Sequence, residues 1–535
     1  MRIQKSLWRA GGAAAALAVA SLAGTPASAQ LLDGLLGESA PAQPVKPMYG
    51  NLKPFYGNLK PFWGNLKPFW GDTTAFYGDF STFWGVSNPV VGAGAPEYAK
   101  VGDYWTAAGT TWDSIFRNWD ATPGNYSATA GALKAMVKDA RGFWGASVQA
   151  KTGKSFEAGF SNAILARYGI NLSDPKSLSE LDQTERAMFF LEWYDGLMTF
   201  AGTDHVDHWM KTVNWSPVLT RPYGLGSPTA IGILDQTLSS AEFGPGKLVQ
   251  FNGTSTFSDG HGAGVASLLI GAHDGKGVMG MVPESKVYAY NPFDSTGTAS
   301  WDDVTEGVRT LKASGASVVN MSLGVPGMTF DPGWNNVFAN LQTTLILKNT
   351  VFVVAAGNEG ATQTANVNWL PINPAVIVVG SVDVEGNISN FSNRPGEACL
   401  STLGLLCLPG QRLKDRFIVA PGELLLVSDG QGGLTRQIGT SFAAPIVTGV
   451  IALMLEANPN LNWRDVKEIL IRAARQNDQD ALRLHWLECI RTRNASMSDV
   501  DLGTKVMVIV DLATRSLWQG GAFTYDPVRR SVRKA

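Results

Sequence analysis

The sequence predicts an α/β domain with a mainly parallel sheet flanked by helices, preceded by a mostly helical domain and a segment of aromatic heptad repeats. Three features of the 535-residue chain support this prediction. From 227 onward, apolar runs typical of buried strands alternate with helical patterns. Between 96 and 220 apolar residues recur at helical spacing, and between 48 and 85 a unit of seven residues repeats.

The composition excludes several classes of protein. Lys and Arg number 43 against 45 Asp and Glu, so the net charge predicts no nucleic-acid partner. Hydrophobic residues make up 45% of the chain, which is enough to build a core. The chain has 5 His and 3 Cys, so we predict no metal cluster. His205 and His208 form an H-x-x-H pair, but no third ligand accompanies them.

Residues 1–29 have the three parts of a secretory signal peptide. Arg2, Lys5 and Arg9 form a basic region. The apolar stretch 11–24 is too short to span a bilayer, and Ala27-Ser-Ala29 is typical of a cleavage site. An uncleaved membrane anchor is the alternative. We expect the signal peptide to direct export, so that the protein is secreted or periplasmic.

Residues 30–95 form a low-complexity segment that contains the repeats of 48–85. The strong copies combine an aromatic pair with Gly, Asn, Leu, Lys and Pro. Gly and Pro in every strong copy exclude a coiled coil and favour an extended or turn-rich ribbon. The segment is either a spacer or a tether that docks on the cell envelope, on a glycan or on the protein's own surface. Its many aromatic residues favour docking.

Residues 96–220 are predicted to form a helical domain. Asp182 and Glu185 match a capping box at the start of one helix. Gly202 stands where that helix is expected to end. Seven apolar residues at helical spacing predict its buried face: Ala187, Phe190, Leu191, Tyr194, Leu197, Met198 and Ala201.

The stretch beyond Ser227 contains four apolar runs that predict strands buried on both faces. These runs are Ala230–Leu234, Val318–Val319, Val351–Ala356 and Val376–Val379. A helix is predicted over Asp303–Ala313, because Val304, Val308 and Leu311 share one face. In parallel sheets ligands bind beyond the carboxyl ends of the strands, so we expect the functional site there.

Four polar side chains stand at the ends of these predicted elements. Asp235 directly follows the first strand, and Asn358 follows the run 351–356. His261 begins a turn that leads into a short apolar helix. Ser441 lies at or beside the start of a helix that contains Pro445, where N–H groups and the helix dipole favour negative charge. An acyl-transfer enzyme needs this environment beside its nucleophile.

Around these residues, from 227 to 474, the sequence resembles the subtilisin-like serine proteases, or subtilases. The resemblance rests on Asp235 at its strand end, on His261-Gly262 with Val265 and Ala266, on Ala355-Ala-Gly-Asn358, on Gly439-Thr-Ser441 with Ala443 and Pro445, and on the flanking Asn320–Gly324 and Val419–Gly422. The sedolisins share a similar serine segment but use Glu as base, and His261 argues against them.

The chain departs from the subtilase pattern next to two of these residues. Gln236 and Thr237 follow the aspartate, where the family usually has Ser or Thr and then Gly. Ala263 and Gly264 stand where the family has Thr and a second His. These changes affect the neighbours of the acid and the base.

The resemblance implies a serine endopeptidase that hydrolyses polypeptides through an acyl-enzyme intermediate. It implies Ser441 as nucleophile, His261 as general base, Asp235 as the residue that orients the base, and Asn358 in the oxyanion hole. Substrate-binding backbone is implied at Ser322, Leu323, Gly324, Ala355, Ala356 and Gly357. The chemistry requires no cofactor. Subtilases often carry structural calcium, for which this sequence assigns no ligands.

Cys399 and Cys407 lie close together in an insertion rich in Gly, Pro and Leu. An exported protein can oxidise them, so a disulfide is predicted, with two thiols as the alternative. Cys489 is left over.

The predicted catalytic domain spans 221–475, and 476–535 is predicted to be a C-terminal extension. In this extension Val506–Val510 and Arg515–Trp518 are expected to pair as a hairpin.

Two functions from different classes remain open on the sequence alone. The first is an exported serine endopeptidase whose helical domain, 96–220, acts as a prosegment. The second is a catalytically inactive subtilase-like protein that binds a surface through its aromatic repeats.

Overall fold

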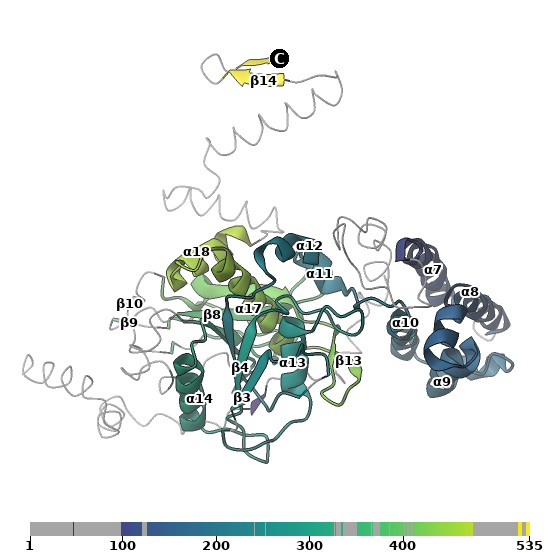
Figure 1. Ribbon diagram of the computed structural model, residues 1–535, viewed down its shortest axis with the longest axis horizontal. Coiled ribbons are helices and arrows are strands. Elements are labelled where there is room, and N and C mark those ends of the chain that lie inside the picture. Colours follow the sequence, from purple (N-terminus) through teal and green to yellow (C-terminus); the bar gives the residue numbers. More distant parts are fainter. Residues whose placement is uncertain are drawn as a thin grey trace, which may run out of the picture. The chain divides into compact units, whose positions relative to one another are not determined.

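The fold is that of a computed structural model of the 535-residue chain (Figure 1). It describes residues 46–47, 98–119, 126–474, 523–526 and 531–534, with gaps at 240, 252, 326, 328–332, 335–336, 338–349, 365, 368–374, 385, 401, 404–405 and 408–409. The predicted signal peptide, the repeats of 48–85 and Cys489 lie outside the described residues.

The chain divides into two compact units, residues 1–472 and 473–535. In the second unit, the described residues form an antiparallel hairpin of β14 (Phe523–Asp526) and β15 (Ser531–Lys534). The hairpin predicted from Val506–Val510 and Arg515–Trp518 lies outside the described residues and stays a prediction.

A sheet of seven parallel strands forms the centre of the first unit, in the order β11-β8-β7-β5-β2-β4-β3. This sheet confirms the predicted α/β fold. The strands are β2 (Ala230–Leu234), β3 (Leu248–Phe251), β4 (Lys286–Tyr290), β5 (Val318–Met321), β7 (Val351–Ala355), β8 (Val376–Val382) and β11 (Phe417–Pro421).

Helices cover both faces of this sheet. Helices α13 (His261–Ile270) and α17 (Thr440–Ala457) share a buried cluster with Val353, whereas α14 (Trp301–Ala313) shares another with Val354. Consecutive residues of a strand point to opposite faces, so the alternation shows that both faces of β7 are covered. Figure 1 shows α13 and α14 on opposite sides of the strands. This burial explains why the strands are apolar at nearly every position.

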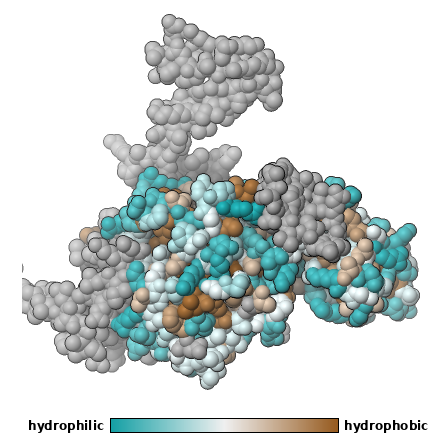
Figure 2. Space-filling model, viewed as in Figure 1, coloured by the Kyte–Doolittle hydropathy of each residue, from teal (hydrophilic) through white to brown (hydrophobic). Residues whose placement is uncertain are grey.

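The surface of the described residues mixes polar and apolar side chains. On the face drawn in Figure 2, hydrophilic residues surround separate apolar patches. Large apolar residues that are exposed, such as Leu219, Ile388 and Ile469, are far apart in the sequence. Scattered exposure of this kind is normal for a folded domain.

The region before the sheet is helical, as the sequence predicts. Its main helices are α7 (Tyr98–Asn118), α8 (Tyr126–Thr152), α9 (Asn162–Arg167) and α10 (Gln183–Met198). Tryptophans dominate the core, where Trp105 lies with its ring centroid 5.7 Å from those of both Trp112 and Trp144. All three indoles are at most 1% exposed.

Helix α10 confirms the predicted start and corrects the predicted end. Asp182 and Glu185 form a capping box, with the Glu185 N–H 2.8 Å from Asp182 Oδ1 and the Asp182 N–H 2.9 Å from Glu185 Oε2. All seven residues of the predicted face are buried. The helix ends at Met198, four residues before Gly202. The N–H groups of Phe200 and Ala201 bond carbonyls three residues back, which replaces the α-helix by tight turns.

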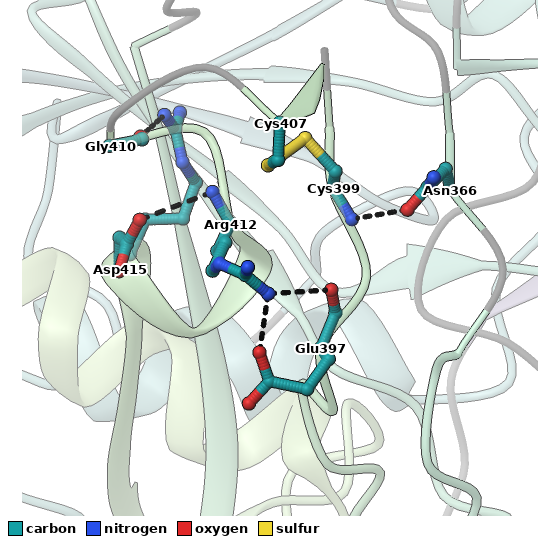
Figure 3. The surroundings of a disulfide bond; sticks show 8 residues. Asn366, Glu397, Cys399, Cys407, Gly410, Arg412 and Asp415 are labelled. Carbon is teal, nitrogen blue, oxygen red and sulfur yellow. Dashed lines mark hydrogen bonds and ion pairs between the residues drawn. A yellow bond between two sulfur atoms is a disulfide. The ribbon is translucent and has the colours of Figure 1, made fainter. Parts of the chain in front are cut away.

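The predicted disulfide between Cys399 and Cys407 is present, with an S–S distance of 2.09 Å (Figure 3). It joins the short β10 (Leu406–Cys407), which pairs with β9 (Thr402–Leu403), to the chain before β9. The Cys399 N–H donates to Asn366 Oδ1 at 2.8 Å. The hydrogen bond to Asn366 thus fixes the Cys399 end of the disulfide to another part of the domain.

A buried cluster of charges joins the helical region to the sheet domain. Arg436 lies on β13 (Leu434–Gln437), which pairs with β12 (Leu425–Ser428). Its Nε and Nη2 each donate to one oxygen of Asp195 on α10 at 2.7 Å. Its Nη1 donates to Asp207 Oδ1 at 3.2 Å. His205 completes the cluster, with Nε2 3.0 Å from Asp195 Oδ1.

The pKa of Asp195 reflects this environment. Burial raises the pKa, but the Arg436 guanidinium and His205 outweigh burial and lower it to about 2 from its ordinary 3.8. A carboxyl group whose pKa is lowered on folding contributes stability above its unfolded pKa and loses it as the pH falls. The stabilisation is therefore present above about pH 4 and disappears toward pH 2.

We expect Asp195→Asn to lower the free energy of unfolding by about 3 kcal/mol at pH 7, because it removes one partner of a buried ion pair. The loss should shrink as the pH falls below 4 in urea denaturation curves. Glu157→Gln is the matched control, because Glu157 pairs with Arg141 where both side chains are exposed by 37% or more. It should cost less than about 1 kcal/mol. Equal losses for the two variants would contradict the buried pair.

Candidate active site

Asp235 and His261 form a buried hydrogen-bonded pair. Asp235 follows the last residue of β2, and His261 is the first residue of α13. His261 Nδ1 lies 2.9 Å from Asp235 Oδ1, and both side chains are fully buried. The Gln236 N–H donates to the same oxygen at 2.8 Å. Contact with this carboxylate fixes Nδ1 as the protonated nitrogen of a neutral imidazole.

Two glycines let α13 begin this close to the end of β2. Gly260, at the N-cap, has a φ of 98°, which a residue with a side chain rarely adopts. A Cβ at Gly262 would lie 2.7 Å from a Leu238 methyl group and 2.9 Å from the Gln236 carbonyl oxygen. The His-Gly sequence therefore serves the close approach of helix and strand.

The departure at Gln236 and Thr237 has a structural explanation. Gln236 is fully buried, and its Oε1 accepts from the Asp259 N–H at 2.9 Å. The Thr237 hydroxyl accepts from Asn291 Nδ2 at 3.0 Å. Gln236 thus connects the end of β2 to the loop before His261, and Thr237 connects it to the residue that follows β4. These hydrogen bonds hold the segment that carries Asp235, and the family pattern of Ser or Thr followed by Gly would lack the Gln236 and Thr237 side chains that make them.

Ser441 is the second residue of α17 and has no exposed surface. Its Oγ donates to the Ser322 carbonyl oxygen at 3.3 Å, and its own carbonyl oxygen accepts from Ser322 Oγ at 2.7 Å. Ser322 Oγ in turn accepts from Asn320 Nδ2 at 2.9 Å. The end of β5 therefore holds the first turn of α17. Pro445 is the sixth residue of α17, close to the helix start as the sequence predicts.

Asn358 lies beside the same helix start. Its Oδ1 accepts from the Thr440 N–H at 2.8 Å and from the Thr440 hydroxyl at 3.0 Å. Because an N–H donor must face an oxygen, these bonds orient the amide with Nδ2 away from Thr440. Nδ2 is buried and has no hydrogen-bond partner among the described residues. The arrangement offers one buried N–H donor beside Ser441.

The predicted substrate-binding residues fall into two groups. Leu323–Gly324 form the short strand β6, which pairs with β1 (Lys46–Pro47). The N–H groups of Ala356 and Gly357 donate to the Val379 carbonyl at 2.9 Å and the Thr440 hydroxyl at 3.1 Å. These two N–H groups are thus already bonded within the domain. Among the predicted substrate-binding residues, the backbone of β6 is the part that pairs with another segment.

Phe442 is a site residue that the sequence analysis did not single out. Its ring centroid lies 5.5 Å from that of His261, and it directly follows Ser441. A Cβ at Gly264 would lie 3.2 Å from the Phe442 ring and 3.1 Å from a Val427 methyl group. Gly264 therefore leaves room for the phenylalanine. Part of the signal was available in the sequence, because Gly264 stands where the family has a second His.

No metal centre is evident among the residues that the structure describes. They contain no group of three or more His, Cys, Asp or Glu placed to hold an ion. His205 and His208 lie in the cluster around Arg436, where His208 Nε2 is 3.4 Å from the Leu424 carbonyl oxygen. Structural calcium stays a prediction without a ligand set.

Comparisons with known proteins agree on one family. Residues 229–487 match the model described as the subtilase family. Subtilisin DY of Bacillus licheniformis is 27% identical over 255 residues, which cover 46% of this chain and 84% of that protein. Subtilisin E of Bacillus subtilis (strain 168) is 25% identical over 296 residues, which cover 52% and 70%. The solved structure of the prenylagaramide maturation protease PagA covers 49% of this chain and 90% of its own, with 25% identity and a TM-score of 0.39.

These matches define the class of protein as a serine-type endopeptidase, a hydrolase that acts on polypeptides. The matched residues, 229–487, contain all seven strands of the parallel sheet, so the likeness to the subtilase family lies in this domain.

We expect Gly264→Ala to lower the free energy of unfolding by about 1–2 kcal/mol, because the new Cβ meets Phe442, Val427 and the Ser428 carbonyl oxygen at 3.1–3.3 Å. Displacement of Phe442 should also move His261 and lower kcat. Urea denaturation and steady-state kinetics measure the two effects.

Two further variants test whether crowding causes the loss. Phe442→Leu should recover part of it when combined with Gly264→Ala, because a smaller side chain makes room. Gly131→Ala on α8 is the control, because a Cβ there meets nothing within 4 Å. It should stabilise the protein by up to about 1 kcal/mol. A stabilising Gly264→Ala would disprove the steric argument.

Proposed function

We propose that the chain is an exported endopeptidase in which Ser441, His261 and Asp235 act as a catalytic triad. The observation that carries this proposal is the buried hydrogen bond of 2.9 Å between His261 Nδ1 and Asp235 Oδ1. A structural role alone does not require an imidazole and a carboxylate fully buried together beside the helix start that carries Ser441. The family match supplies the expected reaction.

In the first step Ser441 Oγ attacks the carbonyl carbon of a peptide bond. With Nδ1 bonded to Asp235, the neutral ring of His261 presents Nε2 as its basic nitrogen. Nε2 takes the hydroxyl proton and then delivers it to the leaving amine, which leaves an ester on Ser441. Water hydrolyses the ester by the same proton transfers in reverse. Asp235 stabilises the imidazolium in both halves of the reaction.

The oxyanion of each tetrahedral intermediate needs N–H donors. Asn358 Nδ2 is the first, because Thr440 already occupies the Oδ1 end of the amide. The Ser441 N–H at the start of α17 is the second, and the helix dipole adds positive potential there. Side chains and backbone of this chain supply every group in the scheme, so we propose no cofactor for the chemistry.

We propose export on the basis of residues 1–29, with a secreted or periplasmic location. The hypothesis that 96–220 is a prosegment rests on its position before the catalytic domain. The Arg436 cluster favours continued association of the two regions, because separation would expose a buried guanidinium. The predicted contact of the repeats with the cell envelope or a glycan lies outside the described residues.

The alternative is a catalytically inactive surface-binding protein. The oriented Asn358 amide and the intact Asp235–His261 pair favour the enzyme, because a scaffold has no need of an unsatisfied buried donor.

A fluorophosphonate probe separates the two functions. The probe should label Ser441 in the wild type and leave Ser441→Ala unlabelled, because only an activated serine reacts with it. Mass spectrometry of the labelled peptide measures the site. No labelling of the mature protein would favour the inactive alternative.

We expect Asn358→Ala to lower kcat by about 10²–10³, the size known for the equivalent donor of subtilisin. KM should change little, because the donor acts on the oxyanion. Thr440→Val should lower kcat less, since the amide loses one of its two anchors and keeps the Thr440 N–H. Asn387→Ala is the control, because the Asn387 side chain is exposed and its amide bonds Asp383. Equal changes in kcat for the two variants would contradict this role.

A further inference from the structure

Strand β6 already carries a peptide segment of the same chain. Lys46–Pro47 pair antiparallel with Leu323–Gly324, with Lys46 opposite Gly324 and Pro47 opposite Leu323. These partners lie far upstream of the helical region and the catalytic domain. The backbone predicted to bind substrate is therefore occupied by residues that precede the repeats.

The direction of this pairing leads toward the nucleophile. As the segment runs from 46 to 47, its partner runs back from Gly324 to Leu323. One more step in this register reaches Ser322, whose carbonyl oxygen lies 3.3 Å from Ser441 Oγ. A peptide that enters along β6 in this direction thus delivers its third residue to the catalytic serine.

The proline fixes which residue pairs carry hydrogen bonds. Opposed residues of an antiparallel ladder alternate between hydrogen-bonded and non-hydrogen-bonded pairs. Pro47 has no N–H, so the bonded pair is Lys46 with Gly324, and position 47 faces away from β6. The next residue of such a peptide is again in a bonded position, with its N–H toward the Ser322 carbonyl. Proline is therefore compatible with the second position of a peptide bound on β6. At the third position it would remove the N–H that bonds the Ser322 carbonyl.

The chain contains four copies of the sequence that follows this rule. All four Lys-Pro dipeptides of the protein lie seven residues apart, beginning at Lys46, Lys53, Lys60 and Lys67. Met or Phe follows each proline, then Tyr or Trp, then Gly. The dipeptide on β6 is the first of these units. The heptad repeat is thus a tandem array of the sequence found on the substrate-binding strand.

We propose that the repeats are tandem substrates of the enzyme's own cleft, which binds each Lys-Pro unit on β6 and cleaves the bond after the residue that follows the proline. The predicted bonds are Met48–Tyr49, Phe55–Tyr56, Phe62–Trp63 and Phe69–Trp70. This inference rests on the proposed triad for cleavage, whereas binding on β6 requires only the backbone of the cleft.

Each cut follows the balance of peptide hydrolysis. The bond between the carbonyl carbon of Met48 or Phe and the nitrogen of Tyr or Trp breaks, and the amine leaves with a proton from His261. Water then supplies hydroxide to the acyl carbon and a proton to Ser441 Oγ through the same base.

Tandem copies in one chain keep the cleft occupied. A tethered copy has an effective concentration in the millimolar range, so a cut unit is replaced by the next one. While Lys46–Pro47 or a later unit lies on β6, another peptide cannot pair with the same backbone. The array therefore delays activity on outside substrates until its last copy is removed.

Self-cleavage is tested on the full chain. Incubated wild-type protein should yield fragments whose new N-termini are Tyr49, Tyr56, Trp63 and Trp70, detected by mass spectrometry after amine labelling. Ser441→Ala alone should yield none, and it should be cut at the same bonds when wild type is added. Cuts at other bonds, in a preparation that the fluorophosphonate probe shows to be active, would overturn the proposed specificity.

Binding is tested separately from catalysis. The protein is full-length Ser441→Ala with Gly-Ser in place of all four Lys-Pro units, so that its own array does not compete. A fluorescent peptide with the sequence of residues 59–66 should bind in an anisotropy titration. The control peptide exchanges Pro61 and Phe62, which puts proline where an N–H is needed, and should bind at least about tenfold more weakly.

The two experiments distinguish the failure of each proposal. Fluorophosphonate labelling without preferential binding of the 59–66 peptide leaves the protease standing and overturns the tandem-substrate inference. Preferential binding without labelling supports the occupied cleft and overturns the triad.

As a third readout, the Gly-Ser variant with Ser441 intact should cleave a small chromogenic peptide several-fold faster than wild type at early times. Equal early rates would contradict occupation of the cleft by the array.

Discussion

A chain of buried hydrogen bonds holds the start of α17 against the ends of two strands, and the rest of the site depends on it. Thr448 donates to Asn320 Oδ1 at 3.0 Å, Asn320 to Ser322 Oγ at 2.9 Å, and Ser322 Oγ to the Ser441 carbonyl at 2.7 Å. Thr440 makes the corresponding link to β7 through Asn358. In a low-dielectric interior such groups are costly unless all are paired, so the network has one arrangement. That arrangement fixes Ser441 and orients the amide of Asn358.

The sequence predicts those parts of the site that local rules govern. The positions of Asp235 and Asn358 at strand ends could be predicted, because an apolar run stops where its strand ends. The position of Ser441 could be predicted because the composition of a helix start is recognisable. The partner of Arg436 could not be found this way, since Asp195 is 241 residues distant and nothing local indicates which carboxylate a buried arginine will meet. The same limit applies to Gly264 on α13 and Phe442 on α17. Whether the ring fits against the glycine depends on how closely the two helices pack, which no local pattern indicates. The end of α10 was missed because a glycine is only one of several ways to stop a helix.

The Arg436 cluster illustrates how two regions of different composition become one compact unit. Ion pairs in an interior gain little net stability, because desolvation of the charges offsets their attraction. Their geometry is demanding, however, and only one relative position of α10 and β13 satisfies both oxygens of Asp195 together with Asp207. The cluster therefore specifies how the helical region is placed more than it strengthens the fold. Apolar packing around the tryptophans supplies the bulk of the stability.

The apolar character of α17 has a consequence for the export that we propose. Among the described helices, Thr440–Ala457 is long and apolar enough to cross a membrane, although 78% of it is buried within the fold. A chain that passes unfolded through a translocation channel exposes this segment to the lipid before any sheet can cover it. Thr440, Ser441 and Thr448 lower its tendency to partition into the bilayer, since each hydroxyl must be satisfied there. Under the proposed export, the hydroxyl groups that hold the start of α17 in the fold would also reduce arrest of the unfolded chain in the membrane.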